Sequence, residues 1–313
     1  MIETITTAEL PIREVMKIKK NSLCPEHMTG EEQRLCIVTG VHGDDLAGQF
    51  ICYEVIRKIK ENYQHLKGIV DVYPAINPLG LDAGTREWPL FNMDMNMAFP
   101  GSFEGTMTEY TAAKIMEDLK GANVCIDIHS SSIFLKEIPQ VRINDDVALE
   151  LMPYAKQMNM DFVWIHPSTT VKQGSIVNAL NEMGTKAMVI EGDVAMRIDQ
   201  SYCNQVVDGI FALMKYMGIW TGETKVPRKP HISDDGKVVF INGETSGVFV
   251  PSVEHSKQVK QGEKIGEIIE PLTGSVEEEI FSPCDGIVFT LREYPVVSEG
   301  ALLARVLGEE KYD

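Results

Sequence analysis

The strongest constraint on the fold is an alternation of short apolar segments with amphipathic ones, running from about Leu35 to Met217. The apolar segment 35–40 predicts a buried strand, and Leu46–Leu66 repeats apolar side chains every three or four residues, which predicts a helix. Strands that alternate with helices predict an α/β fold whose sheet is covered on both faces. Further strands are expected at 68–76, 123–128, 162–166 and 186–192, and further helices at 108–119, about 145–158, 174–183 and 201–217.

The composition changes at 221–236, which is polar and proline-containing as a linker would be. Strand-like segments punctuated by glycine and proline follow, and they predict a small all-β domain. We therefore place the domain boundary between 1–222 and 223–313. The second domain looks like a lipoyl or biotinyl carrier, but its hairpin at 271–275 lacks the lysine that a carrier modifies. A lid or an oligomerisation element is expected instead.

A formal net charge of −17 makes nucleic acid an improbable partner, since an acidic surface repels phosphate. No apolar run is long enough to span a bilayer, and the N-terminal segment lacks the features of a secretory signal. We expect a cytoplasmic protein that acts on a small molecule, either as a monomer or as a homo-oligomer.

Three candidate metal ligands stand where predicted core strands end. His42 and Asp45 follow strand 35–40, and their spacing at a helix entry lets both side chains point to one side. A histidine near a turn is more often a hydrogen-bonding residue, so the prediction depends on His129 at the end of strand 123–128. Asp127 lies on the same face of that strand and can orient the ring. Two histidines and one carboxylate at strand ends predict a catalytic zinc site with a fourth position open to water.

Two further residues have chemistry that suits such a site. Glu191 emerges from an otherwise apolar strand, where a carboxylate is costly without a partner or a role. It is either an ion-paired or capping residue or a general base beside the metal. Arg86 lies on the long loop 77–105 and is either a surface residue or a group that stabilises an oxyanion.

In their order along the chain, these motifs resemble the succinylglutamate desuccinylase/aspartoacylase family, relatives of zinc carboxypeptidases. The resemblance covers roughly residues 35–215, and it implies a mixed central sheet flanked by helices and followed by a C-terminal β module. The motifs are His-Gly-Asp-x at 42–45, Asn-Pro-x-Gly at 77–80, Arg86 before Asp-x-Asn at 94–96, Phe-Pro-Gly at 99–101, Asp-x-His at 127–129 and Glu-Gly at 191–192.

The resemblance also implies a role for each matching residue. One Zn²⁺ per chain would be held by His42, Asp45 and His129. Glu191 would be the base and later the proton donor, Arg86 would stabilise the oxyanion, and Asn96 would contact a substrate carboxylate.

Two positions depart from the family's pattern. The family has Glu where this chain has Asp45, one methylene shorter, and we expect weaker zinc binding. It has Arg where this chain has Met97, and a thioether cannot hold a carboxylate. Either the substrate lacks a carboxylate there, or another arginine such as Arg142 or Arg197 supplies the charge. His166, after strand 162–166, is a further candidate for the pocket, whereas His65, His231 and His255 are expected to be solvated.

The leading functional prediction is zinc-dependent hydrolysis of an amide bond, other than a peptide bond, in a small N-acylated amino acid or amine. One alternative is a metallocarboxypeptidase, against which Met97 argues because such enzymes hold a terminal carboxylate firmly. Another alternative is a non-catalytic binding protein that retains the fold, since Asp45 and Met97 both alter the site. The retained histidines, Arg86 and Glu191 favour an enzyme.

Overall fold

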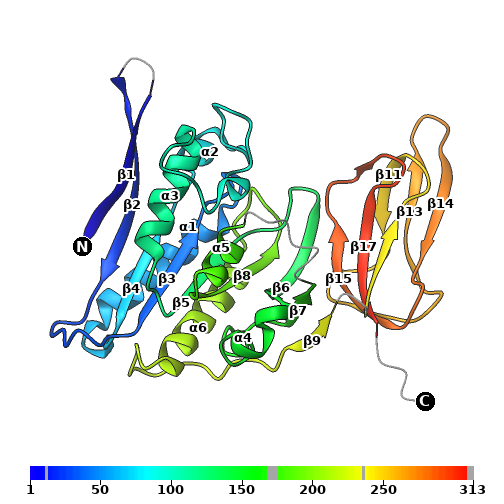
Figure 1. Ribbon diagram of the computed structural model, residues 1–313. Helices are drawn as coiled ribbons and strands as arrows, with labels where there is room; N and C mark the ends of the chain where they lie inside the picture. The colour runs from blue at the N-terminus through cyan, green and yellow to red at the C-terminus, as the bar shows by residue number, and fades with distance from the viewer. Residues whose placement is uncertain (11–12, 168–174, 235–236, 309–313) are drawn as a thin grey trace.

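A computed structural model describes residues 1–10, 13–167, 175–234 and 237–308 (Figure 1). Its main framework is a sheet of 13 strands, ten of which form one continuous path. The path is β1 (Ile2–Glu9), β2 (Val15–Leu23), β4 (Ile69–Tyr73), β3 (Arg34–Thr39), β5 (Val124–Ile128), β8 (Lys186–Asp193), β6 (Leu135–Asn144), β15 (Gly286–Arg292), β17 (Leu302–Gly308) and β10 (Val238–Asn242). Beside it, β7 (Phe162–His166) pairs with β6, β9 (His231–Asp234) with β7, and β12 (Gln258–Val259) with β15.

The sheet is mixed, as the family resemblance implied. Strands β4, β3, β5 and β8 are parallel neighbours in its centre, whereas β2 and β6 join them antiparallel. The central strands are buried on both faces, which explains their mostly apolar sequences. Parallel neighbours also bring their carboxyl ends to a single edge of the sheet, where ligands usually bind.

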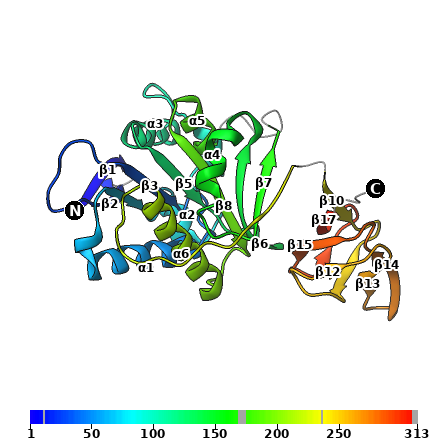
Figure 2. The same ribbon diagram turned by 90° about the horizontal axis from the view of Figure 1, so that it is seen from below.

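Helices cover both faces, each by burying one apolar stripe. The α1 stripe of Ile51, Val55 and Ile59 is buried as predicted. Helices α1 (Ala47–Glu61), α4 (Ala148–Ala155) and α6 (Gln200–Tyr216) contribute to one core cluster, and α3 (Met107–Leu119) and α5 (Ile176–Glu182) contribute to the other. Figure 2 shows α1 and α6 on the opposite side of the sheet from α3 and α5. No helix in the described part of the chain is both long and apolar enough to cross a membrane.

The C-terminal part is all β, and it shares the main sheet. Its strands β10, β15 and β17 continue that sheet beyond β6. A second sheet of four strands lies beside them (Figure 1). Its strands are β14 (Ser275–Phe281), β13 (Lys264–Glu270), β11 (Gly247–Pro251) and β16 (Val296–Val297). Part of the predicted linker is the strand β9, and the domain boundary after residue 222 stays a prediction.

Candidate metal centre and its cavity

Two histidines meet because the strands that precede them are parallel neighbours in register. Thr39 at the end of β3 pairs with Ile128 at the end of β5, so the segments leaving the two strands begin side by side. His42 and His129 lie on these segments and are almost completely buried. Their ring centroids are 4.9 Å apart.

Glycine is required in the turn between His42 and α1. A Cβ atom on Gly43 would lie 1.9 Å from the carbonyl carbon of Gly80, so the two backbones approach too closely for any side chain. Asn77 fixes this approach: its side chain donates to the Val41 carbonyl at 3.2 Å and accepts from the Gly80 amide at 2.9 Å. The motifs at 42–45 and 77–80 therefore form a single packing unit.

Three potential ligand atoms converge at the edge of the sheet. His42 Nδ1 and His129 Nδ1 lie 3.2 Å apart, and Asp45 Oδ2 lies 3.2 Å from the first and 2.9 Å from the second. Ligands of a tetrahedral zinc ion, at about 2.0–2.2 Å from the metal, are roughly 3.3–3.6 Å from one another. The triangle is close to one face of such a tetrahedron, and His, Asp and His are ligand types that zinc accepts.

Carboxylates orient the rings of His42 and His129 by contacting the Nε2 atom of each. Asp94 Oδ1 lies 3.1 Å from His42 Nε2, and Asp127 Oδ2 lies 2.8 Å from His129 Nε2. Such contacts leave Nδ1 of each ring as the atom that faces the site. Asp45 is fixed as well, because its Oδ1 accepts a hydrogen bond of 3.0 Å from the Ser130 amide.

The electrostatics of the centre favour a cation. Burial alone would raise the pKa of Asp45, but hydrogen bonds from His129 and His42 lower it to about 2. Burial would likewise lower the pKa of His129, yet the charge of Asp127 holds that pKa well above its ordinary value. Asp45 thus stays anionic and stabilises positive charge beside it, a role that a divalent ion fills. The donor set therefore fits zinc.

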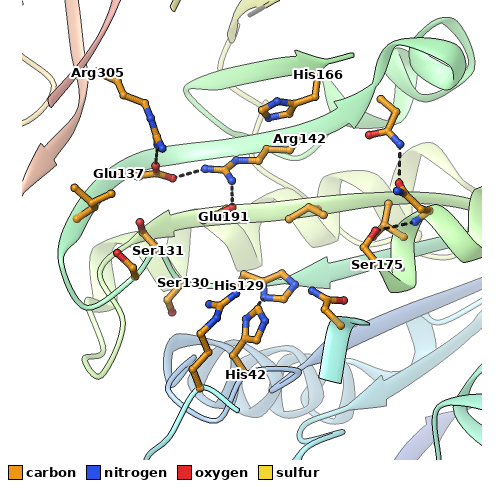
Figure 3. Close-up of a pocket in the computed structure, with 18 residues that line it drawn as sticks. His42, His129, Ser130, Ser131, Glu137, Arg142, His166, Ser175, Glu191 and Arg305 are labelled. Carbon is orange, nitrogen blue, oxygen red and sulfur yellow. Dashed lines mark hydrogen bonds and ion pairs between the residues drawn. The ribbon is translucent and has the colours of Figure 1, made fainter. Parts of the chain in front are cut away.

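His42 and His129 line a cavity of about 570 Å³, shown in Figure 3. Glu191 lines it from β8, and its Oε2 is 2.6 Å from Arg142 Nη1. Burial raises the pKa of Glu191 above its ordinary value, although the Arg142 guanidinium opposes the shift. The lining comprises His42, Arg86, Asn96, His129, Ser130, Ser131, Ser132, Leu135, Glu137, Arg142, Asn144, His166, Ser175, Val177, Asn178, Val189, Glu191 and Arg305.

Most of the residues selected from the sequence meet at this cavity. Arg86 lines it with a side chain that is 49% exposed, and its Nη2 contacts Asp94 Oδ2 at 3.3 Å. Asn96 also lines it, and its side-chain oxygen accepts a hydrogen bond of 3.3 Å from the Ile176 amide. Arg142 and His166 line it from β6 and β7.

Three selected residues are not among the described residues that line the cavity: Asp45, which lies buried behind the two histidine rings, Met97 and Arg197. Met97 is 45% exposed, because it lies on the short 3-10 helix Met95–Ala98, where consecutive side chains point in different directions. Asn96 faces the cavity, and Met97 therefore does not. Arg197 is exposed in the turn before α6. The structure therefore does not support a direct role in substrate binding for Met97 or Arg197.

Sequence reasoning missed three residues that shape the site: Asp94, Glu137 and Arg305. Arg305 is a charged residue inside an apolar strand, the same signal that identified Glu191, whereas Glu137 lies on a strand with several polar residues and gave no such signal. The expectation for His255 was also wrong: this histidine is half-buried, and its Nε2 is buried without a partner among the described residues.

Comparisons with known proteins place the chain among deacylases. Residues 31–217 match the model of the succinylglutamate desuccinylase/aspartoacylase catalytic domain. The chain is 25% identical over 292 residues to N-alpha-acetyl-L-2,4-diaminobutyric acid deacetylase from Halomonas elongata, covering 88% of this chain and 82% of that protein.

Two solved structures share the fold over nearly the whole chain. The product-bound ectoine utilization protein EutE (DoeB) from Ruegeria pomeroyi has a TM-score of 0.82 at 20% identity, covering 95% of this chain and 90% of that one. The succinylglutamate desuccinylase/aspartoacylase from Rhodobacter sphaeroides has a TM-score of 0.79 at 19% identity, covering 96% and 90%.

Proposed function

The chain belongs to the succinylglutamate desuccinylase/aspartoacylase family, and from that premise we propose that it uses a zinc ion to hydrolyse the amide bond of a small N-acylated amino acid. One observation carries the proposal: the ligand atoms of His42, Asp45 and His129 converge beside a cavity that Glu191 also lines. The predicted ligand set, one zinc per chain and the predicted roles are all parts of this proposal.

Each step of the hydrolysis can be assigned to residues of the chain. When bound, zinc polarises a carbonyl group and makes water acidic near neutral pH. Glu191 accepts a proton from the attacking water and later gives a proton to the leaving nitrogen. Water thus adds to the carbonyl carbon, the carbon–nitrogen bond breaks, and a carboxylate and an amine leave.

The other residues position the reacting groups. Asp94 and Asp127 contact Nε2 of the two rings, so Nδ1 of each would be free to hold the ion. Arg142 fixes Oε2 of Glu191, which leaves Oε1 for the proton transfers. Arg86 donates to the developing oxyanion, and its large exposed fraction gives it the freedom to turn toward the substrate.

The relative from Halomonas elongata suggests the first substrate to test. That protein is a deacetylase of N-alpha-acetyl-L-2,4-diaminobutyric acid. The cavity volume of about 570 Å³ lies within the range usual for small-molecule sites. A small acylated amino acid is therefore the proposed substrate class.

Release of free amine from three probes tests the proposal. Zinc-loaded protein is incubated with Nα-acetyl-L-2,4-diaminobutyrate, N-acetyl-L-aspartate and N-succinyl-L-glutamate. At least one probe should be hydrolysed, and Glu191→Gln should reduce kcat by roughly 10²- to 10⁴-fold with zinc still bound. The control Glu150→Gln removes an exposed carboxylate and should change little. Near-normal turnover by Glu191→Gln would remove the assigned base.

A further inference from the structure

The C-terminal sheet brings an arginine to the cavity through a row of side chains across three strands. Glu137 on β6 pairs with Thr290 on β15, and Thr290 pairs with Arg305 on β17. Side chains in such a row lie on the same face of a sheet, with neighbouring strands about 4.8 Å apart. The register of the continuous sheet therefore fixes Arg305 beside Glu137 and inside the cavity wall.

Glu137 is a buried carboxylate whose two oxygens are both used. Its side chain is 2% exposed. Oε1 accepts from Arg305 Nη1 and from Thr290 Oγ1, whereas Oε2 accepts from Arg142 Nη2 at 2.6 Å and from Gln140 Nε2 at 2.7 Å. Removing such a residue from a buried network is costly, so Glu137 holds both guanidinium groups in place.

The two arginines differ in what their remaining nitrogens contact. Arg142 uses Nη1 for Glu191. Arg305 donates only through Nη1: Nε is buried without a partner, and Nη2 has no hydrogen bond to any residue in the described part of the chain. The Arg305 guanidinium lies 5.6 Å from the ring of Trp164 and 5.1 Å from that of Phe240, which restricts its orientation.

An unused edge of a guanidinium matches a carboxylate. Nε and Nη2 lie on one side of the group and can donate two parallel hydrogen bonds. Figure 3 shows Arg305, Glu137 and Arg142 across the cavity from His42 and His129, with Glu191 between them. A substrate whose amide lies at the metal ligands would extend its other end toward Arg305.

We propose that Arg305 is the specificity-determining residue that binds the carboxylate of the substrate, in place of a charged residue at position 97. The inference rests on the proposed function, since it concerns the same cavity. Met97 provides no charge and is not among the described residues that line that cavity. The C-terminal part of the chain would thus complete the active site with one side chain.

The test compares a carboxylate substrate with its neutral amide. For zinc-loaded protein, kcat/KM is measured for Nα-acetyl-L-2,4-diaminobutyrate and for the corresponding carboxamide, with wild type, Arg305→Gln, Arg305→Lys and the control Lys264→Gln. Lys264 carries a positive charge elsewhere in the C-terminal part, on β13. Arg305→Gln should lower the preference for the carboxylate roughly 10- to 100-fold, mainly through KM, because charged hydrogen bonds contribute that much. Turnover of the carboxamide should stay within a few-fold of wild type.

An equal loss on both substrates, or an unchanged preference, would overturn the role of Arg305. If Arg305→Gln does not fold, Arg305→Lys decides: a reduced preference supports the proposal, and an equal loss on both substrates refutes it. If wild type hydrolyses neither compound, the proposed substrate class is wrong, but the binding of a carboxylate by Arg305 can still be tested. Calorimetric binding of L-2,4-diaminobutyrate should then exceed that of its carboxamide in wild type but not in Arg305→Gln, and equal binding in wild type would refute the proposal.

Discussion

At the scale of single residues, the fixed position of Asp45 sets the geometry of the proposed metal centre. Oδ1 is held by the Ser130 amide while Oδ2 completes the triangle with both Nδ1 atoms. Because the three atoms already meet at 2.9–3.2 Å, the shorter carboxylate needs no bridging water. A residue one methylene longer would have to give up the Ser130 contact or displace a ring.

Asp45→Glu should therefore weaken zinc binding, by about 10-fold if one hydrogen bond to a charged group is lost. Competition with a chromophoric chelator measures the dissociation constant, and circular dichroism checks that the variant is folded. Tighter zinc binding by Asp45→Glu would contradict this account, because it would show that the centre accommodates the longer side chain without losing a contact.

Local sequence selected Glu191 and the three residues that converge, His42, Asp45 and His129, because each follows or interrupts an apolar strand in a recognisable motif. It could not identify what Glu137 and Arg305 do. Their contact joins residues 168 positions apart through the register of three strands, and no local pattern specifies that register. Asp94 was likewise visible within a motif, but its contact with His42 depends on how a long loop folds back.

At the scale of elements, the strands that the sequence missed are the unusual ones. The parallel core strands β3, β4, β5 and β8 are mostly apolar and were all predicted. Strand β6 contains Pro139, which usually argues against a strand, and the structure accommodates it where the pairing with β8 is irregular. Strands β1 and β2 form an edge hairpin that is only partly buried, so their apolar signal is weak.

His255, which lies just before β12, should make the stability of the protein depend on pH. Burial, followed by the charge of Lys136, lowers the pKa of His255 to about 4, against an ordinary value of 6.5. As the pH falls below 6.5, His255 becomes protonated in the unfolded chain but stays neutral in the folded chain. The contribution to stability is thus complete above pH 6.5 and is lost progressively toward pH 4.

Between pH 7 and pH 5, His255 should cost the wild type about 1–2 kcal/mol of unfolding free energy. His255→Gln removes the titrating group. Between pH 7 and pH 5, the free energy of unfolding of this variant should therefore fall by about 1–2 kcal/mol less than that of the wild type. Urea unfolding of both proteins at the two pH values measures the difference. Parallel losses in the two proteins would show that His255 does not titrate in this way.

At the scale of the whole molecule, one sheet connects the catalytic core to the C-terminal part. Apolar packing reinforces this connection, because the ring of Phe289 on β15 lies 5.3 Å from that of Phe162 and 5.4 Å from that of Trp164. Separation of the two parts would break strand pairs and expose these rings. The C-terminal part is therefore integral to the fold.

We expect calorimetry of the zinc-loaded protein to give a single unfolding transition, in which the calorimetric and van't Hoff enthalpies agree. Phe289→Ala should lower the transition temperature of the whole protein, since it removes a fully buried ring. Two resolved transitions, of which only one shifts in Phe289→Ala, would instead indicate that the parts unfold independently on either side of the linker.

The central claim is that His42, Asp45 and His129 form a zinc centre, and metal analysis tests it most directly. Protein purified without added metal is measured by elemental mass spectrometry, beside His129→Ala and the control His231→Ala, which alters an exposed histidine. The account predicts about one zinc per chain in wild type and the control, and almost none in His129→Ala. Wild-type protein that is repeatedly free of metal and does not take up zinc at micromolar concentration would contradict it.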